Sequence, residues 1–99
     1  MNLLIMAATE AEIMPLPASP KGRWDVDLLI TGVGMLATAY ALTKHMQKNK
    51  YDLIIQAGVG GSFDRHLEPG SLVFVTTDQY GDLGAEDHDE YLDICDLAL

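Results

Sequence analysis

Four short runs of apolar residues predict the strands of one sheet. The runs cover Leu3–Ala8, Val26–Ile30, Leu53–Ala57 and Leu72–Val75. Continuous apolar runs of this length are typical of strands that are buried on both faces, as in a parallel sheet. The pattern therefore predicts an α/β fold with a central, mostly parallel sheet flanked by helices.

Helical spacing appears between the second and third runs, over Met35–Lys48. One face of this helix carries four apolar residues, Met35, Ala39, Leu42 and Met46. Strand, glycine turn, helix and strand then form a βαβ unit. A shorter helical turn is expected at Glu10–Met14, ended by Pro15.

The last residues of the chain are expected to be helical from about Asp89, with Asp87 or Asp89 as the N-cap. The helical face would carry Tyr91, Ile94, Cys95 and Ala98. No glycine, proline or basic last turn follows, and four buried strands need more helices than this chain offers. Residues 1–99 are therefore expected to be the N-terminal half of a single domain, with Cys95 in its core. A terminal helix that frays without a cap is the alternative.

The charge balance narrows the class of partner. The formal net charge is −9, from 15 acidic and 6 basic residues. Such a field repels phosphate backbones and anionic lipid, which disfavours nucleic acid and membrane surfaces as partners. No apolar stretch approaches the length of a membrane span, and one cysteine allows no disulfide within a chain. We expect a cytoplasmic protein.

Two glycine turns follow the second and third apolar runs. The first, Gly32–Ala37, matches the dinucleotide fingerprint, but the acid at the right distance, Asp52, would lie at the opposite edge of the sheet. We therefore expect no nicotinamide or other cofactor. The second turn, Gly58–Ser62, ends the neighbouring strand, so the two turns predict one crevice for a small ligand. The alternative is that they serve only chain reversal and packing.

Acidic residues gather between Asp78 and Asp96, where there are eight acids and no Lys or Arg. The candidates for a metal site among them are Asp82, Glu86, Asp87, His88, Asp89 and Glu90. Their spacing does not fit an EF-hand, and no second histidine lies near His88. We expect no metal here, and interpret the segment as a solvated loop or as a contact loop between subunits.

Three segments of the chain resemble the nucleoside phosphorylase and nucleosidase superfamily. They are Ala7–Ile13, Thr31–Gly34, and Gln56–Gly61 together with Pro69–Val73. Their order and spacing cover most of the chain, so the match is more specific than either glycine motif. The most similar members are the futalosine hydrolases and the methylthioadenosine/S-adenosylhomocysteine nucleosidases, and Tyr80–Asp87 resembles the futalosine hydrolases in particular.

The resemblance implies roles for single residues. Glu12 stands where the family places the carboxylate that activates water, and such a group can also stabilise positive charge on the ribose. The substrate-binding residues that it implies are Thr9, Val33, Gly34, Val59, Gly60 and Gly61. Thr9 and Val33 would line the ribose and its 5′ side, and the last three would lie along the purine.

Departures from the family pattern affect the reaction and the substrate. Phosphorylases of the superfamily hold phosphate with an arginine at the position of Gln56, so the resemblance implies hydrolysis. Thr9 replaces a commoner Met, which suits a more polar 5′ substituent. The connection Met14–Trp24 is shorter than the family's usual hairpin. The family's ribose-binding Met-Glu pair and its purine-protonating Asp belong to the second half of the domain.

The function that the resemblance implies is N-glycosidic hydrolysis of a purine nucleoside by a homo-oligomer, expected to be a homodimer. The expected reaction converts futalosine into hypoxanthine and dehypoxanthine futalosine, a step of menaquinone biosynthesis. One alternative is a methylthioadenosine/S-adenosylhomocysteine nucleosidase. The other is an inactive fragment that associates through its incomplete sheet.

Overall fold

The computed structural model describes residues 1–14, 16 and 22–98. They divide into two units, Met1–Phe63 and Asp64–Leu99, and each unit has its own architecture. Pro15, at which the first helical turn was expected to end, lies outside the described residues.

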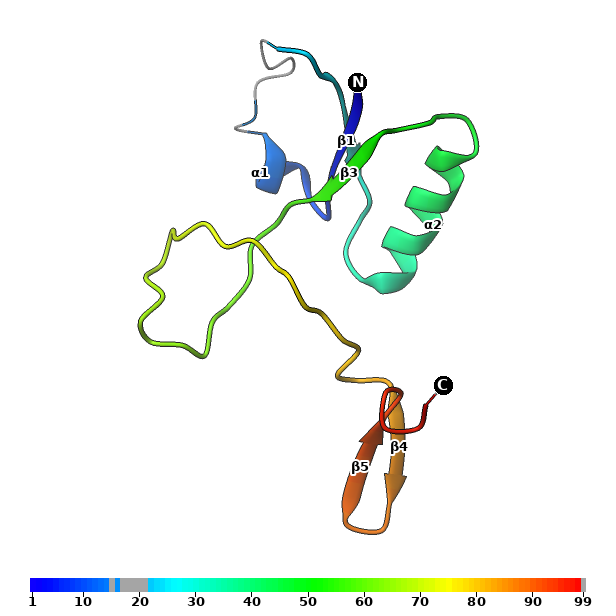
Figure 1. The fold of residues 1–99 in the computed structure, drawn as a ribbon, viewed down its shortest axis with the longest axis vertical. Helices are drawn as coiled ribbons and strands as arrows, with labels where there is room; N and C mark the ends of the chain where they lie inside the picture. Colours follow the sequence, from blue (N-terminus) through cyan, green and yellow to red (C-terminus); the bar gives the residue numbers. More distant parts are fainter. Residues whose placement is uncertain (15, 17–21, 99) are drawn as a thin grey trace. The chain divides into compact units, whose positions relative to one another are not determined.

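Three parallel strands form the sheet of the first unit (Figure 1). β1 (Asn2–Ala7) is the central strand, between β2 (Asp25–Ile30) and β3 (Leu53–Gln56). The register places Ile5 of β1 opposite Leu28 of β2 and Ile55 of β3. These strands confirm the first three apolar runs as parallel neighbours.

The core of the first unit lies on its central strand. Leu4, Met6 and Ala7 of β1 are buried, together with Ile13 of α1 (Glu10–Ile13), which contacts β1. β3 is exposed along its length, and β2 is at most half-buried. Among the described strands, buried residues on both faces are found only in β1, where Leu4 and Met6 lie on one face and Ala7 on the other, and β1 is the strand that α1 contacts.

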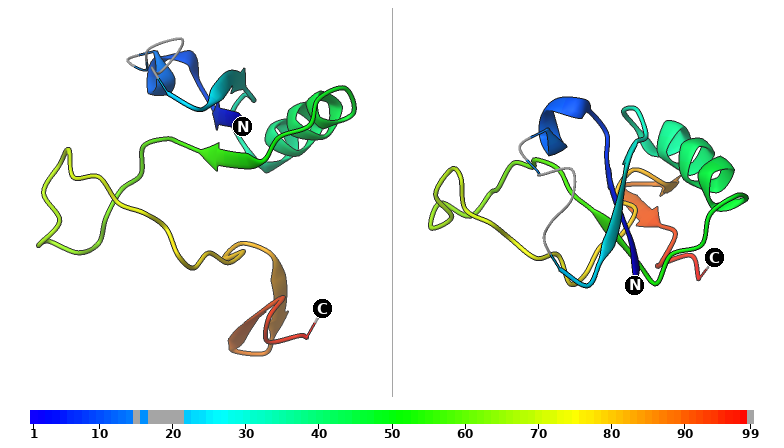
Figure 2. Two further views of the ribbon diagram at one scale, coloured as in Figure 1. Left: turned by 45° about the horizontal axis from the view of Figure 1, so that its top comes forward. Right: turned by 90° about the horizontal axis from the view of Figure 1, so that it is seen from above.

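α2 (Met35–Met46) confirms the predicted helix and ends two residues earlier than expected. The residues on its partly buried side are Ala37, Thr38, Ala41, Leu42 and His45. The predicted apolar face is wrong, because Met35 and Met46 are exposed. Small side chains let this helix approach the chain closely: the Ala37 Cβ lies 3.3 Å from the point where a Cβ on Gly32 would stand. α1 and α2 lie on opposite sides of the sheet (Figure 2).

The fourth apolar run forms no strand. Leu72–Val75 has no strand pairing among the described residues, and its side chains are exposed, with Leu72 at 100% and Phe74 at 89%. The prediction of a strand here is wrong. A β-branched sequence favours extended backbone, but a strand also needs a partner for its N–H and C=O groups.

A two-stranded hairpin is the regular structure of the second unit. β4 (Gly84–Asp87) and β5 (Glu90–Asp93) are antiparallel, with Ala85 opposite Leu92. The chain reverses at His88, whose φ of +58° is left-handed. The predicted helix from Asp89, with Asp87 or Asp89 as its cap, is therefore wrong.

A capped helical turn follows β5, four residues later than the sequence predicted. Asp93 Oδ1 accepts from the backbone N–H of Cys95 at 2.8 Å and of Asp96 at 2.9 Å. Asp96 Oδ2 accepts in return from the Asp93 N–H at 3.1 Å. This reciprocal pattern is that of a capping box, so the cap is Asp93. Cys95 is exposed on this turn, and its predicted place in a core is wrong.

Candidate active site

The carboxyl ends of the three parallel strands bring together the segments that the sequence singled out. Hydrogen bonding continues past the end of β1 on both sides: the Gly32 N–H donates to the Ala8 carbonyl at 3.1 Å, and the Ala57 N–H donates to the Met6 carbonyl at 2.8 Å. The loop after β2 and the segment after β3 therefore both lie beside the residues that follow β1. This arrangement confirms that the two glycine turns flank one edge of the sheet.

Thr31 fixes the first glycine turn. Its side chain is buried, at 7% exposure, and its hydroxyl donates to the Gly32 carbonyl at 2.9 Å and lies 3.2 Å from the Thr38 hydroxyl. Gly32 has a left-handed φ of +83°. A threonine directly after an apolar strand was the signal that sequence reasoning did not use. The turn is therefore held by side chains as well as by glycine flexibility.

The first glycine turn presents the start of α2 to this edge. Gly34 is the N-cap, with a φ of +98° and no side chain to cap the helix, and its carbonyl accepts from the Thr38 N–H at 3.0 Å. Val33 beside it is 77% exposed. Backbone N–H groups in the first turn of a helix can donate to ligand oxygen atoms. The predicted binding residues Val33 and Gly34 thus lie where a ligand can reach them.

Glu12 lies between the ends of β1 and β3. Its Oε2 accepts from both the N–H and the hydroxyl of Thr9, each at 2.9 Å. Its Oε1 accepts from the Val59 N–H at 3.3 Å. The structure therefore brings three predicted site residues, Thr9, Glu12 and Val59, into one hydrogen-bonded group.

These hydrogen bonds lower the pKa of the Glu12 carboxyl below its ordinary value. The largest cause is the Thr9 hydroxyl, followed by the Thr9 N–H and the Val59 N–H, and desolvation opposes them. Each donor stabilises the charged form. Glu12 is thus a carboxylate at neutral pH, which is the form that can accept a proton from water.

The second glycine turn leaves this group open. Val59 is 86% exposed, so it meets Glu12 through its backbone alone. A Cβ added to Gly60 or Gly61 would meet no atom within 4 Å. These three residues form an exposed surface next to the carboxylate.

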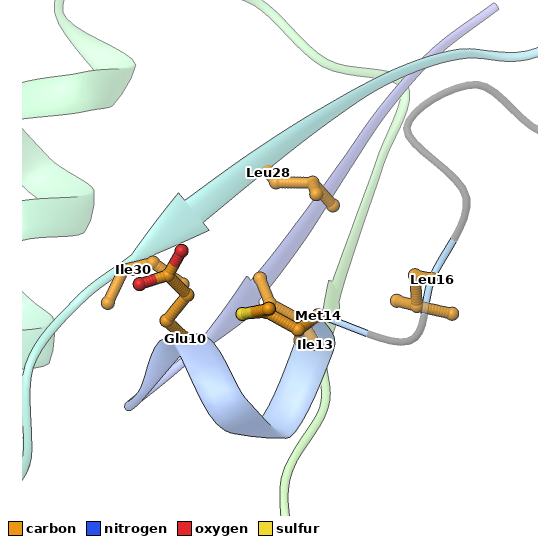
Figure 3. Close-up of a pocket in the computed structure, with 6 residues that line it drawn as sticks. All are labelled: Glu10, Ile13, Met14, Leu16, Leu28 and Ile30. Atoms are coloured by element: carbon orange, nitrogen blue, oxygen red, sulfur yellow. The ribbon is translucent and has the colours of Figure 1, made fainter.

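A separate apolar hollow of about 300 Å³ lies between α1 and β2 (Figure 3). Its lining residues are Glu10, Ile13, Met14, Leu16, Leu28 and Ile30. Glu10, the first acid after β1, places its carboxyl group beside Ile30 in this hollow, whereas Glu12 is not part of the lining. The two neighbouring glutamates thus have different surroundings.

Asp52 lies at the other edge of the sheet, at the amino ends of the strands. Its Oδ2 accepts from the Asn2 N–H at 2.7 Å. This placement confirms that Asp52 stands at the opposite edge from the glycine turns, where it could not bind a ribose held by them.

Nearer that edge is a cluster that sequence reasoning missed. The Tyr51 hydroxyl donates to Asp27 Oδ2 at 2.7 Å and lies 2.7 Å from His45 Nε2. The cluster ties the end of α2 to β2.

The acidic segment of the second unit shows no metal geometry. Among the described residues, no three His, Cys, Asp or Glu side chains are placed to hold a metal ion. His88 Nδ1 lies 3.0 Å from Asp87 Oδ1. Neither helix in the described part of the chain has the length and apolar character that a membrane span requires.

Comparison with known proteins finds a similar enzyme. The chain is 34% identical over 119 residues to the futalosine hydrolase of Streptomyces coelicolor, a match that covers 100% of this chain and 51% of the relative. The chain thus spans about half the length of the curated relative it matches. This similarity confirms the resemblance to the futalosine hydrolases. No family model matches the chain, and no solved structure matches it.

Proposed function

We propose that this chain is the N-terminal half of a nucleosidase-like domain that hydrolyses the N-glycosidic bond of a purine nucleoside, with Glu12 as the residue that activates water. The observation that carries the proposal is the Glu12 carboxylate, held by Thr9 and Val59 beside two glycine turns. The similarity to a futalosine hydrolase supports the reaction class.

The chemistry follows from that carboxylate. Glu12 accepts a proton from water while the water oxygen forms a bond to the anomeric carbon. The bond from that carbon to the purine nitrogen breaks, and its electron pair leaves with the base. The negative charge of Glu12 also stabilises the positive charge that develops on the ribose. A general acid of the second half, which the family resemblance implies, protonates the departing base.

Hydrolysis is favoured over phosphorolysis by the end of β3. Gln56, the last residue of that strand, is neutral where the phosphorylases of the superfamily have an arginine. The chain has only two arginines, Arg23 and Arg65, within a net charge of −9. A negative field without an arginine clamp disfavours phosphate, so water is the nucleophile that fits this site.

The proposed substrate is futalosine, which yields hypoxanthine and dehypoxanthine futalosine in menaquinone biosynthesis. The relative's name and the polar Thr9 in place of Met support this choice. Methylthioadenosine is the alternative substrate. Incubating the full-length protein with each nucleoside and measuring the free base by chromatography distinguishes them. Release from neither nucleoside contradicts the proposal, and release from methylthioadenosine alone contradicts the substrate.

Glu12→Gln tests the residue. The amide keeps the shape of the side chain but cannot take the proton, so we expect turnover to fall about 10²- to 10⁴-fold. Glu10→Gln is the matched control, because Glu10 lies on the same helix but faces the apolar hollow. Equal activity of the two variants would remove Glu12 from its role.

The second candidate is an inactive fragment, and the exposed sheet supports it. Large apolar side chains on β2 and β3 are about 40% exposed, among them Leu28 at 40% and Ile55 at 41%. Such a surface favours association, and we propose that the protein is a homo-oligomer. We expect the 99-residue chain alone to elute as an oligomer without hydrolase activity. A compact, active monomer would contradict this candidate.

A further inference from the structure

The two oxygens of the Glu12 carboxylate have unequal surroundings. Oε2 takes two hydrogen bonds of 2.9 Å, both from Thr9. Oε1 takes one longer bond of 3.3 Å, from the Val59 N–H. A carboxylate oxygen has room for about two donors. Oε2 is therefore occupied, whereas Oε1 can take another donor.

Gly58 keeps the space beside the less occupied oxygen. A Cβ on Gly58 would stand 3.3 Å from Glu12 Oε1 and 3.8 Å from the carboxyl carbon. Gly58 does not have a left-handed φ, so its backbone conformation is open to other residues. A side chain at this position would instead obstruct the approach of a further hydrogen-bond donor, such as water, to Oε1.

We propose that the two oxygens divide the work: Thr9 positions the carboxylate through Oε2, and Oε1, beside Gly58, receives the proton from water. This inference rests on the proposed function and deepens it. Thr9 is a positioning residue in this scheme, because it acts on the reaction through Glu12. Gly58 determines whether a water molecule fits at the reacting oxygen.

Of the three donors that bind the Glu12 carboxylate, the Thr9 hydroxyl is the one that comes from a side chain. Both the hydroxyl and the backbone N–H reach Oε2, but only the hydroxyl depends on the residue type. A donor on Oε2 favours the charged carboxylate. The Thr9 hydroxyl therefore keeps Glu12 ionised down to a lower pH than the two backbone hydrogen bonds would alone. The ionised form is the one that can accept a proton from water.

Thr9→Val tests the positioning role, because valine keeps the branched shape and the backbone N–H but removes the hydroxyl. We expect the acidic limb of the profile of kcat/KM against pH to move to higher pH. At the pH values of that limb and below, kcat/KM should be roughly fivefold lower than in the wild type, and at higher pH it should change little. Thr9→Ser, which keeps the hydroxyl, is the matched control and should restore the limb. Identical limbs in the two variants would overturn the role of Thr9.

A carbon-13 titration of the Glu12 carboxyl group gives a readout that does not depend on turnover. The titration midpoint should rise in Thr9→Val and stay in place in Thr9→Ser. If the full-length protein releases no base, the proposed function is wrong, and so is the proposal that Oε1 receives the proton from water. The titration still decides, by itself, whether the hydroxyl of Thr9 holds Glu12 as a carboxylate.

Gly58→Ala tests the reacting oxygen. The added methyl group crowds Oε1, so we expect kcat to fall about tenfold, the size of effect that a displaced reacting group produces, while the protein stays folded. Gly22→Ala is the control, since a Cβ there meets no atom within 4 Å. A kcat of Gly58→Ala equal to that of the control would overturn the assignment of Oε1.

Discussion

Tyr51→Phe removes one hydroxyl on which two side chains depend. The hydroxyl donates to Asp27 Oδ2 at 2.7 Å and lies 2.7 Å from His45 Nε2, and the His45 and Tyr51 rings stack at 5.7 Å. Phenylalanine keeps the ring and its stacking, so the change isolates the hydrogen bonds. A bond to a charged group contributes about 1.5–3 kcal/mol, and a neutral bond about 0.5–1.5 kcal/mol. Asp27 is exposed and regains water, so we expect a net loss of about 1–2 kcal/mol in the free energy of unfolding.

Urea unfolding followed by the fluorescence of the single tryptophan, Trp24, measures this loss. The slope should stay constant while the midpoint falls. Tyr40→Phe is the matched control, because Tyr40 is 68% exposed on α2, and its change should stay within about 0.5 kcal/mol. If the two variants have the same midpoint, the Tyr51 hydroxyl does not hold the helix to the sheet.

The ionisation of Tyr51 gives a second readout of the same cluster. Desolvation, and then the hydrogen bond and charge of Asp27, raise the pKa of Tyr51 to about 12. A raised pKa means that the neutral form is favoured in the folded state, so this stabilisation is complete below about pH 10 and is lost as the pH rises toward 12. Tyr51→Phe should lack this loss. Parallel stability curves for the two proteins between pH 10 and 12 would show that the tyrosine ionises freely.

Two further predictions concern residues at the carboxyl ends of the strands, Gly32 and Glu12. Gly32→Ala should cost about 1–2 kcal/mol of stability, because a φ of +83° and the Ala37 Cβ at 3.3 Å both oppose a side chain there. Equal urea midpoints for Gly32→Ala and the control Gly22→Ala would contradict this. Glu12 should stabilise the fold above its ordinary pKa of 4.5 and lose that contribution as the pH falls through its lowered folded value. The stability of Glu12→Gln should therefore fall less steeply in acid than that of the wild type, and superimposable curves would show that the carboxylate is not held.

The first unit was predictable because its signals are local. Apolar runs and glycine turns located β1, β2, β3 and α2 within two residues of their ends. The buried side of α2 was not predictable from its apolar spacing, because the close approach of Ala37 to Gly32 decides which side packs. That contact joins a helix to a turn, and helical periodicity describes the helix alone.

The second unit shows how one spacing can describe two structures. Tyr91, Ile94, Cys95 and Ala98 fall at helical intervals, but the first lies on β5 and the other three on the turn after it. His88 has a left-handed φ, which lets the chain reverse so that β4 and β5 pair as a hairpin. A polar two-residue loop between short strands was the overlooked signal.

The candidate site was located by resemblance, but one of its contacts was readable in the sequence. Thr9 and Glu12 are three residues apart, which is the spacing of a capping box. That spacing predicts that the glutamate reaches back to the threonine, as the structure shows. Local sequence could not predict that the Val59 N–H donates to the other carboxylate oxygen of Glu12. That contact depends on how β1 and β3 pair.

The two ends of the sheet therefore have separable tasks. Side-chain hydrogen bonds of Tyr51 and Asp52 hold the fold toward the amino ends of the strands. At the carboxyl ends, one carboxylate stands among glycine turns, threonine side chains and exposed backbone, an arrangement that leaves room for a ligand. Since distant sites without shared partners contribute independently, Tyr51→Phe should lower the urea midpoint without moving the acidic limb of kcat/KM. Thr9→Val should move the acidic limb, and any change that it makes in the urea midpoint should add to that of Tyr51→Phe in the double variant. A Tyr51→Phe variant that also moves the acidic limb would show that the hydrogen-bonded cluster and the carboxylate act as one unit.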